Sequence, residues 1–567
     1  MHAYDTIVIG AGHNGLVCAC YLAKAGRRVL VLERRSVVGG ACVTEEIFPG
    51  FKVSTAAYVT SLFRPEIVHD LRLRDYGLEL LERDPSSFTP FLDGRYLMLG
   101  KDRASNVREI AKFSARDAQR YPEYEAMLER VAAIVEPTLD ETPPNVLSPR
   151  FGDLASLWKL RRAIRRADRR RVIPSEPARE RGRRRGTDCS TARTGEVLEI
   201  LTGAARPILD RWFESEQLKG TLATDAIIGA FAAPSMPGTA YVLFHHVMGE
   251  TNGARGVWSY VRGGMGRLTQ ALASAARDLH VEIRTDTEVR RILTCGNRAT
   301  GVALANGDEH TAAQIASSAD CHVTFERLVD PAALPEDFRE AVSRIDYSSA
   351  SLKINIALDR LPMFICHPEP FDYGAVRRAQ DRLDVEGSTS RPEHRGTIHF
   401  CEDQDFIERA YDDAKYGAPS REPVVELTIP SAVDETLAPS GKHVASMFVQ
   451  YAPHRLKDDT WTHALKDDVA DRCFAVVERY APGFTASVIE RQILAPPDLE
   501  ATFNLTGGNI FQGAMSLNQL FFARPLPGYA NYRTPIRGLY LCGSAAHPGG
   551  GVMGAAGRNA AREMLRR

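Results

Sequence analysis

The pattern of hydrophobic and polar positions at the start of the chain predicts a β-α-β unit. Thr6–Ile9 is a short apolar run of mostly β-branched residues, which is typical of a buried parallel strand. Leu16–Lys24 carries the apolar stripe of a helix, and Gly26 follows it as a helix-ending residue. Val29–Leu32 is a second apolar run. This order predicts the first strand, helix and second strand of a parallel sheet.

Patterns farther along the chain predict more than one structural unit. Strands are expected at Val281–Arg284, Thr287–Leu293 and Leu539–Cys542, a helix after Gly263–Gly266, and a hairpin turn at Asn306-Gly307. We therefore predict an α/β fold, α+β overall, with three parts. These parts are a discontinuous Rossmann-type domain (1–75, 256–335 and 525–567), a mixed-sheet substrate domain (76–104 and 336–524) and a mainly helical insert (105–255). An inserted β-meander is the alternative for the middle piece.

Glycines in the first turn indicate a dinucleotide site. Gly10, Gly12 and Gly15 form G-x-G-x-x-G between the first strand and the helix, and Glu33 ends the second strand. In this motif the glycines allow a tight turn, a close approach to the pyrophosphate and close helix packing. The acidic residue meets a ribose hydroxyl. An ordinary glycine turn in a βα unit is the structural alternative.

A pair of adjacent glycines follows, and it makes the segment similar to a known fold. With Gly39-Gly40 downstream of Glu33, the segment resembles the flavin fold of the amine oxidases and phytoene desaturases. The resemblance implies an FAD cofactor whose pyrophosphate is wrapped a second time at this glycine pair. Many relatives have arginine after the pair, whereas this chain has Ala41, so Arg34 or Arg35 is expected to supply that phosphate contact.

The end of the chain resembles the flavin-closing motif of phytoene desaturases. A strand at Leu539–Cys542 is followed by glycines and by a helix expected from about Val552. The resemblance implies that this helix directs its N-terminus at the flavin pyrimidine, where a helix N-terminus stabilises negative charge. The implied cofactor contacts are Gly543, Ser544, Gly551, Val552 and Met553, together with Val289 near the adenine.

Longer motifs narrow the resemblance. The stretches "HPGGGVMGAAGRNAA" and "GGNIFQGAMSLNQLFFARPLPGY" resemble a phytoene-dehydrogenase-related branch called pyridine nucleotide-disulphide oxidoreductase domain-containing protein 2. The resemblance covers nearly the whole chain except an arginine-rich stretch. The paired redox cysteines of true disulphide reductases are absent, because none of the ten cysteines forms C-x-x-C.

The composition leads us to expect a soluble, cytoplasmic protein and indicates little more. A net charge of −1 predicts no general attraction to nucleic acid. The scattered cysteines predict reduced intracellular thiols, and no cluster has metal-ligand spacing. The first strand begins too early for a targeting segment, and the apolar region 230–248 is interrupted by prolines and histidines, so no transmembrane span is expected. Peripheral membrane contact stays possible.

The arginine-rich stretch 161–185 has two interpretations. It fits a contact with an anionic surface or nucleic acid. It also fits a solvated helix end followed by a flexible loop, over 161–196, which we favour. We assign it no catalytic role.

These patterns predict an FAD-dependent oxidoreductase that moves hydride between flavin N5 and a C–C or C–N bond of an apolar substrate. No second G-x-G-x-x-G directly follows a predicted strand, so oxygen or a quinone is the expected electron acceptor rather than a nicotinamide. The alternatives are a lipid-carrying or partner-regulating protein on the fold of GDP-dissociation inhibitors, and a flavin amine oxidase. The sequence leaves the substrate and the oligomeric state open.

Candidate catalytic residues are few. His547 precedes the C-terminal glycines and is a possible acid or base, with a packed turn residue as the alternative. Asn509 and Gln512 are expected to face the ring across the substrate. Tyr58 is expected to line the same cavity, and His245 and His246 to lie in the core or the pocket wall.

Overall fold

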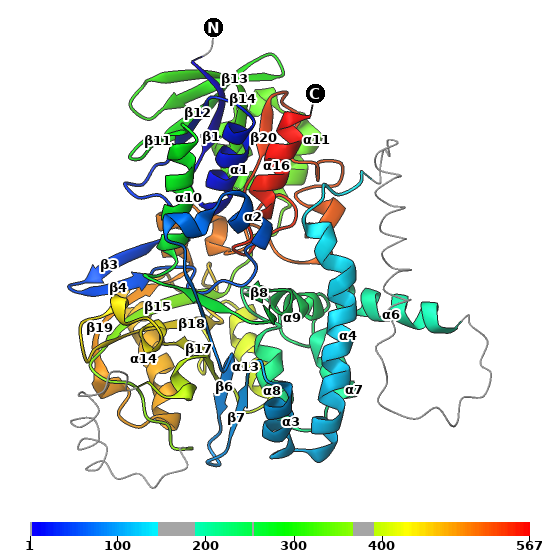
Figure 1. Cartoon of the computed structure of the whole chain (residues 1–567), viewed down its shortest axis with the longest axis vertical. Helices are drawn as coiled ribbons and strands as arrows, with labels where there is room; N and C mark the ends of the chain where they lie inside the picture. Colours follow the sequence, from blue (N-terminus) through cyan, green and yellow to red (C-terminus); the bar gives the residue numbers. More distant parts are fainter. Residues whose placement is uncertain (1–2, 146–187, 252–253, 367–389, 567) are drawn as a thin grey trace.

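The computed structural model describes residues 3–145, 188–251, 254–366 and 390–566 (Figure 1). It has the predicted α/β class, with two seven-stranded sheets in this described part of the chain. The first sheet has the order β11-β2-β1-β14-β13-β12, with β20 beside β14. Its strands are β1 (Tyr4–Ile9), β2 (Val29–Leu32), β11 (Glu282–Arg284), β12 (Val289–Cys295), β13 (Arg298–Leu304), β14 (Glu309–Ser317) and β20 (Leu539–Leu541).

The central strands β11, β2, β1, β14 and β20 of the first sheet run parallel to one another. Their carboxyl ends therefore meet at one edge, where open α/β sheets bind ligands. The predicted turn at Asn306-Gly307 joins β13 to β14, which pair antiparallel. Both segments around the first glycine motif were also predicted correctly, although β1 begins two residues earlier than expected, at Tyr4.

Three helices cover one face of this sheet: α1 (His13–Lys24), α10 (Gly266–Asp278) and α16 (Ala555–Leu565). Figure 1 shows them side by side, and α1 contacts both of the others. The approach of α16 to α1 is close, because a Cβ at Gly557 would lie 2.1 Å from the Asn14 carbonyl oxygen. The apolar core around them combines residues from 7–78, 261–345 and 526–564.

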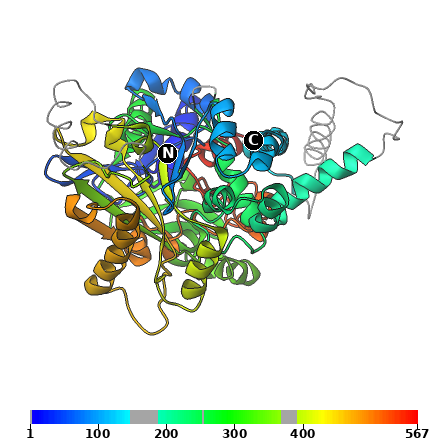
Figure 2. The same cartoon turned by 90° about the horizontal axis from the view of Figure 1, so that it is seen from below.

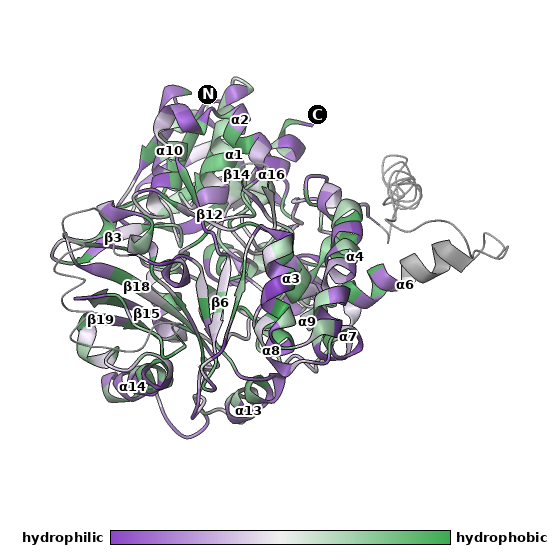
Figure 3. Ribbon diagram, turned by 60° about the horizontal axis from the view of Figure 1, so that its bottom comes forward, coloured by the Kyte–Doolittle hydropathy of each residue, from purple (hydrophilic) through white to green (hydrophobic). Residues whose placement is uncertain are grey.

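The second sheet has the order β19-β15-β18-β17-β16-β6-β7. Its strands are β6 (Ser87–Pro90), β7 (Tyr96–Leu99), β15 (Ser351–Leu358), β16 (Thr397–Phe400), β17 (Val424–Thr428), β18 (His443–Gln450) and β19 (Val488–Leu494). One face is apolar and packs against α14 (His463–Tyr480), through side chains such as Ile354 and Val469 (Figure 3). Because side chains alternate along a strand, the residues between these apolar positions point to the opposite face.

A helical part lies beside the second sheet (Figure 1). Its helices are α3 (Arg103–Ala111), α4 (Ala115–Leu139), α6 (Asp188–Thr202), α7 (Ala205–Trp212), α8 (Glu216–Thr224) and α9 (Thr239–Val247). Figures 1 and 2 both show α6 extending away from the body. The arginine-rich stretch 161–185 lies outside the described residues. Of the flexible loop expected over 161–196, only residues 188–196 are described, and they belong to α6 instead of a loop.

The remaining elements connect these parts. They are α2 (Pro65–Asp70), α11 (Glu336–Ser343), α13 (Gln404–Lys415), α15 (Pro496–Phe503) and the strand pairs β3–β4 (Thr44–Phe48, Phe51–Ser54), β5–β10 (Leu80–Glu82, Ser259–Val261) and β8–β9 (Glu250–Thr251, Ala254–Arg255). Among the described helices, none has the length and apolar character needed to cross a membrane.

Candidate functional site

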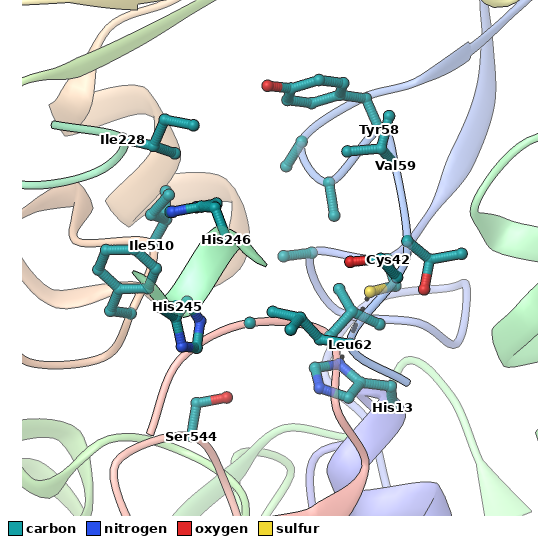
Figure 4. A pocket seen from close by; sticks show the side chains of 18 of the residues that line it. His13, Cys42, Tyr58, Val59, Leu62, Ile228, His245, His246, Ile510 and Ser544 are labelled. Carbon is teal, nitrogen blue, oxygen red and sulfur yellow. Dashed lines mark hydrogen bonds between the residues drawn. The ribbon is translucent and has the colours of Figure 1, made fainter. Parts of the chain in front are cut away.

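A cavity of about 970 Å³ joins the two sheets. At one end it is lined by Gly10 and Glu33, next to the carboxyl ends of β1 and β2. At the other end it reaches Lys353 and Glu426 on the second sheet. Figure 4 shows His13 and Ser544 toward the first end and Tyr58 and Ile228 toward the second. One cavity therefore connects the predicted nucleotide groove with the predicted substrate domain.

The three glycines of the first motif have different roles in the structure. Gly10 has φ +89°, a left-handed conformation that favours glycine. A Cβ at Gly15 would lie 2.2 Å from the Gly10 carbonyl oxygen, so Gly15 allows the helix to pack against the loop. A Cβ at Gly12 would meet only the Gly39 carbonyl oxygen, at 4.0 Å. Gly12 therefore borders open space in the groove, as a position facing a pyrophosphate requires.

Backbone hydrogen bonds hold Glu33 at the wall of the groove. Its side chain is 6% exposed and accepts hydrogen bonds from the backbone N–H groups of Ala11, at 2.8 Å, and Arg35, at 3.0 Å. These bonds fix the carboxylate beside the glycine loop, and it lines the cavity. A carboxylate has room for further hydrogen bonds after accepting two.

The glycine pair closes onto the first loop. The Gly39 N–H donates to the Ala11 carbonyl oxygen at 2.9 Å, and both Gly39 and Gly40 have positive φ. The neighbouring arginines also line the cavity. Arg34 donates through Nη2 to the carbonyl oxygens of Ala501 and Thr502. Arg35 pairs with Glu45, and its buried Nη1 has no hydrogen-bond partner among the described residues.

The C-terminal segment reaches the cavity, but its helix begins later than predicted. Gly543, Ser544, Gly551 and Val552 line the cavity, as does Val289 at the start of β12. The expected helix from Val552 is wrong, because α16 begins at Ala555.

The physical reason is the backbone around Met553. Gly551 and Gly554 have φ of +103° and +71°, which no α-helix contains. The Met553 N–H donates to the Gly551 carbonyl oxygen at 3.0 Å, and its side chain is buried. The expectation that the Met553 N–H faces a bound flavin is therefore also wrong.

Two of the three catalytic candidates lie outside the cavity lining. His547 is buried, and its Nε2 bonds to the Thr138 carbonyl oxygen at 2.9 Å. Burial lowers the pKa of His547 to about 4. Asn509 is buried and binds the Ser348 carbonyl oxygen and the N–H groups of Phe511 and Gly513. Both side chains stabilise turns, and neither lines the cavity in which their predicted catalytic roles would place them.

Gln512, the third candidate, does line the cavity. Its Oε1 accepts a hydrogen bond from the Ala545 N–H at 3.0 Å. This bond joins the 512 segment to the segment that follows β20. Gln512 therefore positions the cavity wall, and the structure gives it no partner that indicates proton transfer.

Two histidines face each other across the Gly551 loop (Figure 4). A Cβ at Gly551 would lie 3.3 Å from His245 Nε2, and His13 Nδ1 lies 3.6 Å from Cys42 Sγ. Burial lowers the pKa of His13 to about 4 and that of His245 to about 3, so both rings are neutral at neutral pH. The position of His245 agrees with the predicted pocket wall. His13 was missed, although it stands inside the glycine motif.

The far end of the cavity carries a polar row that sequence analysis also missed. Lys353 on β15 pairs with Phe448 on β18, which pairs with Glu426 on β17, which pairs with His399 on β16. Cross-strand partners share one face of a sheet, and all four residues line the cavity. Tyr58, predicted from the sequence, lies over this row, with Lys353 Nζ 3.7 Å from its ring centre.

Comparisons with known proteins agree with this geometry. The chain matches the family model described as flavin containing amine oxidoreductase over residues 15–390. It is 46% identical to pyridine nucleotide-disulfide oxidoreductase domain-containing protein 2 of Mus musculus, over 99% of this chain and 93% of that protein. It is 27% identical to a limonene dehydrogenase polypeptide of Castellaniella defragrans, over 99% of this chain and 94% of that protein.

Solved structures show the same fold. Putrescine oxidase bound to putrescine superposes with a TM-score of 0.57 at 14% identity, over 100% of this chain and 99% of that structure. The overall fold is therefore shared with putrescine oxidase.

Proposed function

Because the chain belongs to the flavin containing amine oxidoreductase family and is an FAD-dependent oxidoreductase, we propose that it dehydrogenates a C–C or C–N bond of a largely apolar small molecule. The observation that supports this proposal is the single continuous cavity that contains both the glycine groove and the inner face of the second sheet. A substrate bound in this cavity therefore lies next to the groove that would hold the cofactor.

The residues of the groove fit an FAD molecule. The backbone at Gly10, Gly12 and the Gly39-Gly40 pair would hold the pyrophosphate, because the open space at Gly12 admits it. Glu33 would bind a ribose hydroxyl, and Val289 would contact the adenine. The segments at Gly543–Ser544 and Gly551–Val552 would border the ring system. When bound, FAD supplies the acceptor for the hydride removed from the substrate.

The chain itself orients the substrate and keeps water away from the reacting bond. Val59, Leu62, Ile228 and Ile510 form apolar walls between the two ends of the cavity (Figure 4). The neutral His13 and His245 add polar surface there without adding charge. An apolar lining of this kind favours an apolar substrate body.

We propose both C–N and C–C bonds because the family and one relative are named for different kinds of substrate. The family description names amines, which are oxidised at C–N bonds, whereas limonene dehydrogenase is named for a terpene, in which only C–C and C–H bonds are available. Oxygen or a quinone is the proposed final electron acceptor.

Anaerobic mixing of the purified yellow protein with candidate substrates tests this function. We expect a monoterpene or an alkylamine of similar length to bleach the flavin absorption band within minutes. Short polar alcohols, which leave the apolar walls uncovered, serve as the matched control. Full retention of the oxidised spectrum with every terpene and amine tested would contradict the proposed dehydrogenase.

A second expected result concerns nicotinamides. The first sheet contains one G-x-G-x-x-G loop directly after a strand, at Gly10–Gly15. The same spacing recurs at Gly549–Gly554, but that segment does not directly follow β20 and borders the groove proposed for the flavin. NADH and NADPH are therefore expected to reduce the flavin far more slowly than the substrate does, in stopped-flow experiments without oxygen. Bleaching by either nucleotide at the substrate's rate would show that this chain contains a nicotinamide site.

A further inference from the structure

The far end of the cavity contains a buried arginine with no carboxylate partner. Arg83 is 4% exposed and donates through Nη1 to Thr397 Oγ1 at 2.7 Å. Its guanidinium lies 5.4 Å from the centre of the Tyr260 ring, and its buried Nε has no hydrogen-bond partner. Within the described residues it forms no ion pair with a carboxylate. A buried cation left in this state costs free energy unless a ligand pairs with it.

Another buried arginine shows what a purely structural role looks like here. Arg524 is fully buried and also lacks a carboxylate partner among the described residues. Its donors are used, however, because they bind backbone carbonyl oxygens, including those of Phe511, Gln519 and Ser544. Arg524 does not line the cavity, whereas Arg83 does. The difference indicates that Arg83 retains a donor for a molecule in the cavity.

Lysine adds a second unused donor at the same end. Lys353 is 2% exposed, and its Nζ has no hydrogen-bond partner among the described residues. Burial lowers its pKa well below the ordinary value, and Glu426 opposes this shift. The Ser87 hydroxyl also lines the cavity without a partner in the same part of the chain. Lysine and arginine side chains only donate hydrogen bonds, so the complementary ligand group is rich in acceptors.

The carboxylates at this end include one unused acceptor. Glu426 Oε2 lies 3.5 Å from the Tyr58 hydroxyl, whereas the buried Oε1, 3.5 Å from His399 Nδ1, has no hydrogen-bond partner among the described residues. Burial raises the pKa of Asp225, which favours its neutral form and weakens its repulsion of an anion. The unused nitrogen atoms of Arg83 and Lys353 outnumber this one oxygen, and Arg83 is the permanent cation among them.

From these contacts we propose that the far end of the cavity binds a carboxylate group of an amphipathic substrate, with Arg83 as its binding residue. The inference rests on the proposed function, because it takes the cavity to be the substrate site. The apolar walls hold the body of the substrate, and Arg83 holds its carboxylate. Arginine suits this task because its planar fork matches a carboxylate.

Calorimetry on the FAD-loaded protein tests the inference with three probes of equal chain length: octanoate, 1-octanol and octylamine. We expect octanoate to bind most tightly. Arg83→Met is expected to weaken octanoate at least about tenfold, because a charge-assisted hydrogen bond is lost, while octanol binding stays unchanged. Arg83→Lys, which keeps the charge but loses the fork, is expected to be intermediate.

Arg103→Met is the matched control. Arg103 lines the same cavity, but its side chain is 62% exposed and is paired with Glu125 and Glu129. We expect this variant to bind octanoate like the wild type. Tighter binding of octylamine, unchanged octanoate affinity in a folded Arg83→Met, or no octanoate binding at millimolar concentration would each overturn the proposal. Binding requires no turnover, so these outcomes are independent of the flavin-reduction test.

Discussion

A leucine in place of Gly12 is expected to give a folded protein that holds less than about a tenth of the wild-type FAD. The backbone at Gly12 has φ −67° and ψ 168°, a conformation that any residue adopts. A Cβ there meets no atom closer than 4.0 Å, so the leucine side chain occupies the open groove without disturbing the fold. In that groove it takes the space proposed for the pyrophosphate.

The measurement is the ratio of flavin to protein absorbance after purification with added FAD. Wild-type protein stripped of its flavin gives the reference melting temperature, since loss of a bound ligand alone lowers it. Gly15→Ala is the contrasting variant, because its Cβ would lie 2.2 Å from the Gly10 carbonyl oxygen. It should lose about 1–3 kcal/mol of folding free energy. A Gly12→Leu protein with full FAD content would place the pyrophosphate elsewhere.

The first glycine loop could be predicted from sequence because its determinants are local. The tight turn at Gly10 and the contact of Gly15 with the Gly10 carbonyl oxygen involve residues only a few positions apart. The alternation of strand, helix and strand around them is equally local. Steric rules for short segments are therefore sufficient to locate the groove.

The start of the C-terminal helix could not be predicted from its glycines, because their conformation depends on contacts that are not local in the sequence. Glycine is found inside helices in this chain, as at Gly557, and also at positive φ, as at Gly551 and Gly554. The sequence does not distinguish these states, so the helix start was misplaced. The position of His547 could not be predicted either, because its hydrogen-bond partner is the Thr138 carbonyl oxygen at the end of α4, far away in the chain.

The polar row could be identified only once the register of the strands was known. Lys353, Glu426 and His399 come from three strands, and their alignment depends on pairing through β18. A single signal was present in the sequence: Lys353 lies between apolar residues of β15 that are buried against α14. A charged residue in such a strand indicates that the other face of the sheet is not simply exposed to solvent.

Replacing Arg524 with methionine is expected to destabilise the protein by at least about 3 kcal/mol, because several buried carbonyl oxygens lose their donor. Arg524 is fully buried, and its guanidinium binds the carbonyl oxygens of Phe511 and Ser544 at 2.6 and 2.8 Å. Burial lowers its pKa to about 10, so the side chain stays charged at neutral pH. It thereby joins two segments that line the cavity, and we also expect weaker FAD binding.

Urea denaturation in excess FAD, followed by far-ultraviolet circular dichroism, measures this effect as a lower midpoint. Arg479→Met is the matched control, because Arg479 pairs with Glu422 at 3.0 Å while the two side chains are 42% and 59% exposed. Exposed pairs of this kind contribute less than about 1 kcal/mol, so the control should unfold close to the wild-type midpoint. If Arg524→Met also unfolded there, the buried guanidinium would not hold the two segments together, and their positions would depend on apolar packing alone.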